Sequence, residues 1–239
     1  MFIYARMPHS ISAESYKSIR TSVKYASIDK PIKILQITSA LQGEGKSTVA
    51  GNLAISFSET GHKVLVIDCD LRRPSLHRKF GVSNSLGLTD CLMDRTKTAE
   101  AIQFYSPRLS VIASGTIPPN PAEILGSRTF EKFLKDISAD YDYVILDTPP
   151  LLAVTDSQLL AGKADGAILV VRYGKTRERH INNAYKELVK VRANVIGSIL
   201  NGCDMNRRDT YYRYYGESKK TFFKRNKKKK KRYRSIDIQ

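Results

Sequence analysis

Two glycines, a lysine and a hydroxyl side chain stand at a spacing that suits phosphate binding. The stretch "SALQGEGKSTVA" follows the apolar run 32–39, and Ala40 to Ser47 match the pattern G-x-x-x-x-G-K-[ST] except that Ala40 replaces the first glycine. In this pattern backbone N–H groups wrap phosphates at a helix N-terminus, the lysine reaches the β- and γ-phosphates, and the hydroxyl binds Mg²⁺. An accidental lysine in a glycine-rich turn is the alternative, but the strand before the loop and the helix after it favour a nucleotide site.

The residues predicted to contact the nucleotide belong to this loop and to the end of the last strand. Their list is Gly43, Glu44, Gly45, Lys46, Ser47, Thr48 and Asn201. The two glycines let the backbone approach the phosphates closely. Asn201 has a second interpretation, as a cap of the turn that follows its strand. The predicted cofactors are ATP and Mg²⁺.

Three acidic residues stand at the ends of two other apolar runs. Asp68 and Asp70 follow "VLVI", and Asp147 ends "YVIL". Each acid alone could be a helix cap or a surface charge. In an open parallel sheet, however, ligands bind beyond the carboxyl ends of the strands, where the phosphate loop also lies. The three acids therefore predict a metal and acid–base set for hydrolysis or transfer of a nucleotide phosphate. They also predict an acid-lined site that would attract a basic substrate.

Alternating strands and helices must position these residues. The predicted strands are 32–39, 63–70, 109–114, 141–147, 166–172 and 194–200, and the main helices are 46–59, 121–138, 155–163 and 178–191. Continuous apolar strands with intervening helices are typical of a parallel sheet that is covered on both faces. The sequence therefore predicts a doubly wound, mostly parallel α/β sheet with a P-loop NTPase fold. An amphipathic helix ahead of the first strand is expected to stand apart from it.

Positive charge is distributed unevenly along the chain. The net charge is +17, and residues 207–239 carry fourteen Lys or Arg against three acids, a net +11. Such a segment is expected to be a disordered basic arm, which could bind nucleic acid or an acidic membrane. That interpretation leaves its five tyrosines unexplained. The three widely spaced cysteines indicate reduced thiols, and no segment has the ~20 apolar residues that span a bilayer.

Several motifs together resemble the bacterial tyrosine kinases of the capsule and exopolysaccharide type. "ALQGEGKST" is similar to the Walker A motif of that family, "VLVIDCDLRRP" to its distinctive A′ motif and "VILDTPP" to its Walker B motif. "SGTIPPNPAEIL" resembles a further family segment, and the tail resembles the tyrosine cluster that these kinases phosphorylate on themselves. The resemblance covers essentially the whole chain.

The resemblance implies a site, an activity and substrates. The catalytic set would be Lys46, Asp68, Asp70 and Asp147, and the Mg²⁺ ligands, direct or through water, Ser47, Asp68 and Asp147. Asp70 would accept the phenolic proton, and either Arg72 or Arg73 would offset the developing negative charge. An ATP-dependent protein-tyrosine kinase would then phosphorylate its tail between chains and regulate polysaccharide synthesis and export. The predicted phosphorylation sites are Tyr211, Tyr212, Tyr214, Tyr215 and Tyr233.

The resemblance also implies partners and a location. Family members assemble into rings through a Glu-x-x-Arg-x-x-Arg helix, and here Glu14, Lys17 and Arg20 occupy those positions, so that one arginine is a lysine. The expected partners are a membrane activator of the polysaccharide co-polymerase kind, further copies of the chain, other tyrosine-bearing proteins and a tyrosine phosphatase. Nucleic acid is not expected. The chain would be cytoplasmic and recruited to the inner face of the membrane.

The expected organisation has three parts and leaves two other functions open. An oligomerisation helix (1–30) precedes the kinase domain (31–206) and the tyrosine-rich tail (207–239). One alternative is a partitioning or cell-division ATPase of the related deviant P-loop class, although Leu41 stands where that class has a signature lysine. The other is a nucleotide-gated regulator without catalysis, whose tail only binds acidic surfaces.

Overall fold

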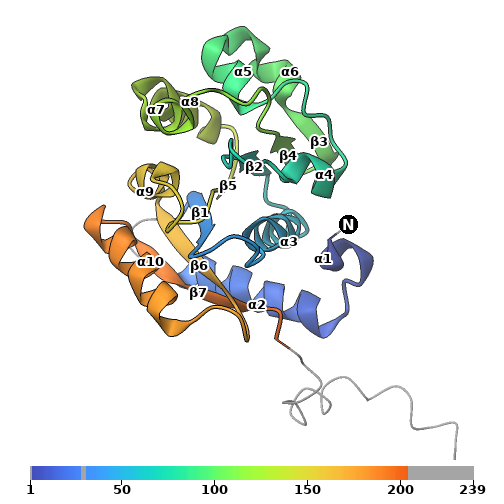
Figure 1. Cartoon of the computed structure of the whole chain (residues 1–239). Helices are drawn as coiled ribbons and strands as arrows, with labels where there is room; N and C mark the ends of the chain where they lie inside the picture. Colours follow the sequence, from blue (N-terminus) through green and yellow to red (C-terminus); the bar gives the residue numbers. More distant parts are fainter. Residues whose placement is uncertain (1, 28–30, 204–239) are drawn as a thin grey trace, which may run out of the picture. The chain divides into compact units, whose positions relative to one another are not determined.

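One mostly parallel sheet forms the centre of the computed structural model, which describes residues 2–27 and 31–203. Within these residues seven strands lie in the order β3-β4-β2-β5-β1-β6-β7 (Figure 1), and only the β3–β4 pair is antiparallel. The strands are β1 Ile34–Ser39, β2 Val64–Asp68, β3 Gln103–Ser106, β4 Leu109–Ile112, β5 Tyr143–Asp147, β6 Gly166–Arg172 and β7 Val195–Asn201. The predicted doubly wound, mostly parallel sheet is confirmed.

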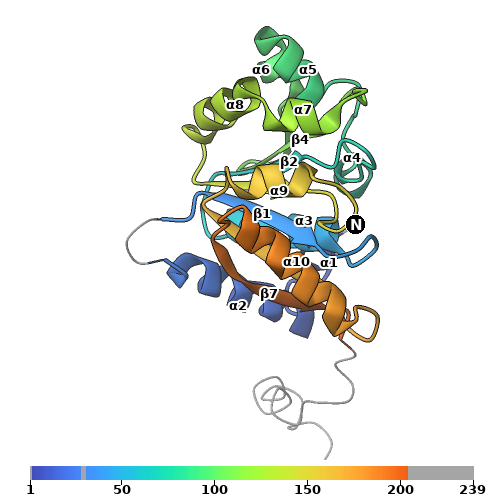
Figure 2. The same ribbon diagram turned by 60° about the vertical axis from the view of Figure 1, so that its left-hand side comes forward.

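Helices cover both faces of the sheet (Figures 1 and 2). They are α1 Ile3–Arg6, α2 Ile11–Tyr25, α3 Lys46–Ser58, α4 Leu76–Phe80, α5 Leu88–Met93, α6 Thr98–Ala101, α7 Pro121–Gly126, α8 Arg128–Ser138, α9 Asp156–Ala161 and α10 Glu178–Lys190, with a short 3₁₀ turn at Arg95–Lys97. Helices α1 to α4 share one hydrophobic cluster with the sheet, and the later helices belong to two others.

Strand β2 shows why its sequence is apolar throughout. Successive side chains of a strand point to opposite faces. Val64 and Val66 therefore pack in the cluster of α3, whereas Leu65 and Ile67 pack in the cluster of α8. Burial on both faces removes the polar alternation that marks a half-exposed strand.

Two local departures from the sequence prediction have simple causes. The helix expected over 121–138 is interrupted at Ser127, whose extended backbone (ψ 156°) ends α7 and whose hydroxyl caps α8 by accepting a hydrogen bond from Phe130 N. The short edge strand β3 was not predicted, because its four residues are polar or only partly buried and it pairs with β4 alone.

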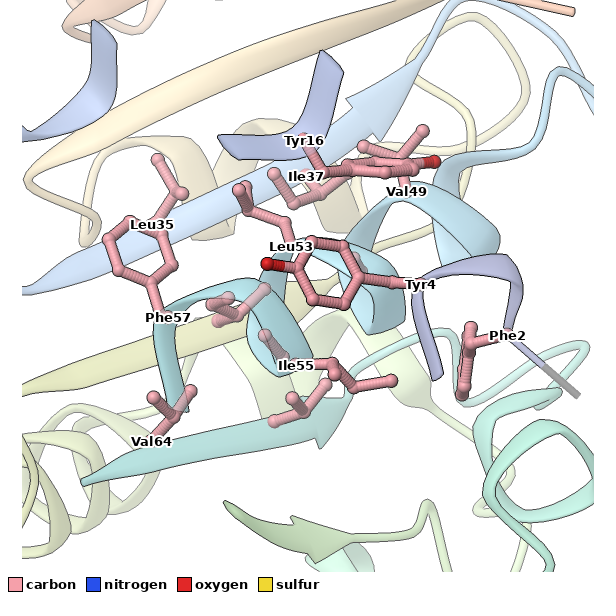
Figure 3. Close-up of a cluster of buried hydrophobic side chains, with 14 of the residues drawn as sticks. Phe2, Tyr4, Tyr16, Leu35, Ile37, Val49, Leu53, Ile55, Phe57 and Val64 are labelled. Carbon is pink, nitrogen blue, oxygen red and sulfur yellow. The ribbon is translucent and has the colours of Figure 1, made fainter. Parts of the chain in front are cut away.

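The N-terminal helices belong to the core of the domain and do not stand apart from it. The side chains of Phe2, Tyr4 and Tyr16 are buried against α3, as Figure 3 shows. Tyr4 N donates a hydrogen bond to Asn52 Oδ1 at 2.9 Å. A Cβ atom at Gly51 would lie 2.1 Å from the Phe2 ring, so only glycine allows this contact. Residues 2–25 therefore pack on the helix that follows the phosphate loop.

Three of the four charged residues of α2 make contacts within the chain. Lys17 pairs with Glu14 at 2.6 Å on the exposed side of the helix. The Arg20 guanidinium donates to the carbonyl and hydroxyl oxygens of Ser56 in α3, at 2.6 and 3.0 Å. Glu14 and Lys17 are thus accessible to a partner, whereas Arg20 anchors α2 to the domain. No helix in the described ranges is long and apolar enough to cross a membrane.

Candidate active site

The phosphate loop joins β1 to α3 and takes its shape from two glycines. Gly43 and Gly45 have φ angles of 81° and 95°, in the left-handed region that glycine adopts without steric cost. Ala40 is buried and has no positive φ, so its Cβ is accommodated. The missing first glycine therefore does not alter the loop. Lys46 and Ser47 begin α3 directly after it.

The side chains of Glu44 and Asn201 hold this loop in place through hydrogen bonds. The buried Glu44 carboxylate accepts hydrogen bonds from Leu41 N and from the Thr176 hydroxyl. Asn201 Nδ2 donates to the Glu44 carbonyl at 2.9 Å and occupies the space beside Gly45. Asn201 also lines the cavity described below, but its amide is engaged in holding the loop. The Asn201 side chain thus bonds to the phosphate loop and not to the turn after its own strand, and its contact with the base stays a prediction.

The three predicted acids come together under the loop. Asp68 and Asp147 are register partners at the ends of the adjacent strands β2 and β5. Lys46 Nζ lies 2.8 Å from Asp70 Oδ2 and 3.8 Å from Asp147 Oδ1. All four side chains are buried or nearly so. One ammonium group therefore faces three carboxyl groups at the carboxyl edge of the sheet.

Hydrogen bonding separates the roles of Asp68 and Asp147. Asp68 accepts from three backbone N–H groups, those of Asp70, Ser75 and Leu76, and so fixes the loop that follows β2. Both carboxylate oxygens of Asp147 are buried without a close hydrogen-bond donor, although the Ser47 hydroxyl is near enough to lower the pKa of Asp147. An unpaired buried carboxylate fits a site for Mg²⁺ or its water ligands. Asp147 fits the predicted metal role, whereas the oxygens of Asp68 are already engaged.

The fit to Mg²⁺ depends on more than protein ligands. The described residues contain no group of three His, Cys, Asp or Glu side chains that could hold a metal ion by themselves. Mg²⁺ usually keeps several waters and binds one or two carboxylates together with substrate phosphates. The set of Asp147 and Ser47 beside the phosphate loop is consistent with that arrangement.

Burial and mutual repulsion shift the acids away from their ordinary ionisation. Burial, with the neighbouring Asp147 carboxylate, raises the pKa of Asp68 to about 7. Burial also raises the pKa of Asp147, against the opposing effect of the Lys46 ammonium. Burial would lower the pKa of Lys46, but the Asp147 and Asp70 carboxylates outweigh it, so that the pKa is raised. The folded site is therefore destabilised when all three carboxyl groups are ionised. A bound cation would reduce this repulsion.

We expect this repulsion to make the free energy of unfolding depend on pH. Asp68 and Asp147 bind more protons in the folded than in the unfolded chain, so the free energy of unfolding should fall as pH rises from about 4 to about 7. Asp147→Asn, which removes a buried charge whose pKa is raised, should stabilise the protein without nucleotide at pH 8. Urea unfolding at pH 5 and pH 8 tests this. A variant less stable than wild type at pH 8 would contradict it, and Asp140→Asn, an exposed acid, serves as control.

A cavity of about 1070 Å³ opens above the loop and the acids. Its lining includes seven cationic side chains, whereas Asp70 is the only acid among the lining residues. The cations are Lys46, Arg72, Arg73, Arg78, Lys79, Arg172 and Lys175. The expectation of an acid-lined site is therefore wrong, because the other acids lie beneath the surface of the cavity. Sequence reasoning missed Arg78, Lys79, Arg172 and Lys175, which belong to no motif spacing.

The structure distinguishes the two arginines that the sequence left equivalent. Arg72 donates two hydrogen bonds to the fully buried Asp156, at 3.0 and 3.1 Å, so its guanidinium is held and neutralised. Arg73 bonds to the neutral Gln42 side chain of the phosphate loop at 2.8 Å. Arg73 thus lies beside the loop with its charge uncompensated. The predicted tail tyrosines lie outside the described residues.

Known proteins are similar to this chain over a range much longer than the phosphate loop. A family model described as an AAA domain matches residues 32–195. The tyrosine-protein kinase YwqD of Bacillus subtilis (strain 168) is 43% identical over 210 residues, which are 87% of this chain and 88% of that protein.

Two solved structures are also similar. The kinase domain of Escherichia coli tyrosine kinase ETK is 33% identical with a TM-score of 0.83, over 88% of this chain and 83% of that one. The crystal structure of the chimerical protein CapA2B2 is 32% identical with a TM-score of 0.79, over 83% of this chain and 88% of that one. The similarity therefore covers most of the chain and not the phosphate loop alone.

Proposed function

The chain belongs to the bacterial tyrosine-protein kinase family, and on this premise we propose that it transfers the γ-phosphoryl group of ATP to the tyrosines of its own tail. The observation that carries the proposal is the contact of Lys46 with Asp70 beside the unpaired Asp147 carboxylate. It supplies a phosphate-binding cation, a proton acceptor and a metal ligand in one place. Family membership sets aside the partitioning ATPase and the regulator without catalysis.

Lys46 and Asp70 have linked tasks in this mechanism. Asp70 Oδ2 accepts a hydrogen bond from Lys46 Nζ at 2.8 Å. Phosphate oxygens of ATP would compete for the ammonium and so release the Asp70 carboxylate. A phenol has a pKa near ~10 and needs such a base at neutral pH. The phenol oxygen bonds to the γ-phosphorus, the β–γ bridging bond breaks, ADP leaves, and the proton passes to Asp70.

The remaining residues position charge around the transferred group. Asp147 and the Ser47 hydroxyl would hold Mg²⁺, which neutralises phosphate charge when it is bound. Asp68 keeps the loop after β2 in place through its three backbone hydrogen bonds. Arg73 is our choice for offsetting the charge that develops on the phosphoryl oxygens, because Asp156 already holds Arg72.

The proposed acceptors are Tyr211, Tyr212, Tyr214, Tyr215 and Tyr233. Truncation after Arg208 should remove most autophosphorylation and preserve ATP binding, because the loop and the acids lie upstream. Eight tyrosines remain, of which Tyr4, Tyr16 and Tyr141 are buried. Mixed with full-length Lys46→Met protein, the truncated chain should phosphorylate that protein's tail. Mass spectrometry after incubation with Mg·ATP measures both results, and phosphate found mainly on the eight body tyrosines would contradict the proposal.

Self-assembly is proposed through the exposed part of α2. Glu14 and Lys17 are available to a neighbouring chain, whereas Arg20 would contribute by fixing the helix on α3. Alanine at Glu14 and Lys17 should therefore lower the mass measured by light scattering to that of a monomer, and Lys24→Ala, an exposed change on the same helix, should not. An unchanged mass in the double variant would remove this interface.

We base the proposed regulatory setting on family membership and on the similarity to CapA2B2. We propose that a membrane activator recruits the chain to the inner face of the membrane, that the chain also phosphorylates other proteins and that a tyrosine phosphatase reverses the reaction. The polysaccharide system would respond to the phosphorylation state of the tail. Similarity to a chimerical structure named CapA2B2 supports the proposed association with a CapA-type protein. Co-purification of the chain with membranes in the presence and absence of the activator gene would test the recruitment.

A further inference from the structure

The part of the cavity mouth next to Asp70 is cationic. Arg73, Arg78 and Lys79 all follow Asp70 within nine residues and line the cavity. Their hydrogen bonds go to neutral oxygen atoms, those of Gln42, Pro74 and Thr48, at 2.8, 3.1 and 3.0 Å. Among the ion pairs of the described residues none includes any of the three. We call these three side chains the cationic rim.

The other cations beside Asp70 are already compensated. Arg72 is paired with Asp156, and Lys46 lies between Asp70 and Asp147. The cationic rim therefore adds uncompensated positive charge, together with Arg172 and Lys175, to the cavity that contains the proposed proton acceptor. A group that flanks the acceptor tyrosine is attracted there if it is anionic and repelled if it is basic.

We propose that the cationic rim binds a phosphotyrosine next to the acceptor tyrosine, so that one phosphorylated residue of the tail promotes phosphorylation of the next. This inference rests on the proposed function. A phosphotyrosine carries roughly −1.5 to −2 charges at pH 7 and three strong acceptor oxygens. Arginine binds phosphate through two parallel hydrogen bonds, and lysine binds it as a point charge. Arg78 and Lys79 suit such a group, while Arg73 keeps its proposed task at the transferred phosphoryl group.

The tail sequence supports phosphotyrosine as the occupant. Four tyrosines stand within Tyr211–Tyr215, separated by Arg213. Each residue of an extended chain spans about 3.3–3.6 Å, so a phosphate on one tyrosine lies within ~14 Å of the others along the chain. Before any phosphorylation the cationic rim repels Arg213 and the neighbouring basic residues of the tail, and the first phosphate reduces that repulsion.

The test compares synthetic peptides of residues 207–220 as substrates of the phosphatase-treated full chain. One peptide carries phosphate on Tyr214, a second has Tyr214→Phe, and a third has Tyr214→Glu, so that all three offer the same three acceptors. We expect kcat/KM for the phosphopeptide to exceed that of the Phe peptide about tenfold, the lower range for one charge-assisted hydrogen bond. Raising the salt concentration from 50 to 200 mM should reduce this ratio.

Substitutions locate the effect on the rim. In Arg78→Gln, kcat/KM for the phosphopeptide should be close to kcat/KM for the Phe peptide. Arg128→Gln, a matched change of an exposed arginine that does not line the cavity, should leave the ratio as it is. Fluorescence anisotropy of the labelled phosphopeptide with saturating Mg·ADP measures binding independently of transfer, and Arg78→Gln should weaken it.

Each other outcome has a separate meaning. Equal rates for the phosphopeptide and the Phe peptide would overturn the inference and leave the kinase function intact. Displacement of the phosphopeptide by Mg·ADP would also overturn it, because the rim would then serve the nucleotide alone. A Glu peptide as good as the phosphopeptide would show recognition of acidic residues in general and remove the phosphotyrosine assignment. If neither the chain nor any peptide were phosphorylated, the proposed function would fail instead.

Discussion

Replacing Lys46 with Met should reduce tyrosine phosphorylation by about 10³-fold or more, the size of effect seen when one preorganised charge-stabilising group is removed. The ammonium would contact the transferred phosphate, and Arg72 cannot take its place, because it is held by Asp156. Phosphotyrosine formation with radioactive ATP measures the loss. Lys132→Met, an exposed lysine on α8, is the matched control and should retain full activity.

Lys46→Met should also lower the stability of the fold. Lys46 compensates Asp70 and Asp147, which are buried, and removal of one partner of a buried pair leaves an uncompensated charge. We therefore expect Lys46→Met to unfold at a lower temperature than wild type, with a larger difference at pH 8 than at pH 5. Circular dichroism establishes that the variant is folded before its activity is judged. A folded variant that still labels itself would show that this site does not catalyse the reaction.

Asp70→Asn should lower the rate of phosphate transfer by about 10²–10⁴, the contribution of a positioned general base. Its effect on nucleotide affinity should be much smaller, since an amide keeps the shape of the side chain and its acceptor oxygen for Arg73 N. Single-turnover transfer and equilibrium binding of a fluorescent ADP separate the two quantities. Wild-type rates in Asp70→Asn would exclude Asp70 as the base.

Asp147→Asn provides the contrast. It should raise the Mg²⁺ concentration needed for half-maximal activity and recover part of the rate when Mg²⁺ is increased, because the carboxylate without hydrogen bonds is the proposed metal ligand. The same substitution should stabilise the protein without nucleotide at pH 8, as argued above from the raised pKa. Equal loss in both variants, with equal recovery at high Mg²⁺, would contradict separate roles for the two acids.

The sequence by itself determined the loop and the sheet that carries it. The phosphate loop is a continuous segment, so the spacing of Gly43, Gly45 and Lys46 already contains its geometry. Strands such as Val64–Asp68 are apolar at every position because both faces are buried, and that pattern is also local. Three acids at strand ends could be placed at one edge of the sheet because all parallel strands end there.

Only the tertiary structure decided which groups each charged residue contacts. Whether Asp68 or Asp147 is free to bind a metal depends on backbone N–H groups of the loop after β2, and the choice between Arg72 and Arg73 depends on Asp156, 84 positions away. The packing of Phe2 on α3 likewise joins segments about fifty residues apart. Electrostatic and packing energies depend on the distance between two residues in space. That distance cannot be read from the number of residues that separate them in the sequence. The cationic mouth above the buried acids exists only after folding, and the proposed preference for an anionic neighbour of the acceptor depends on it.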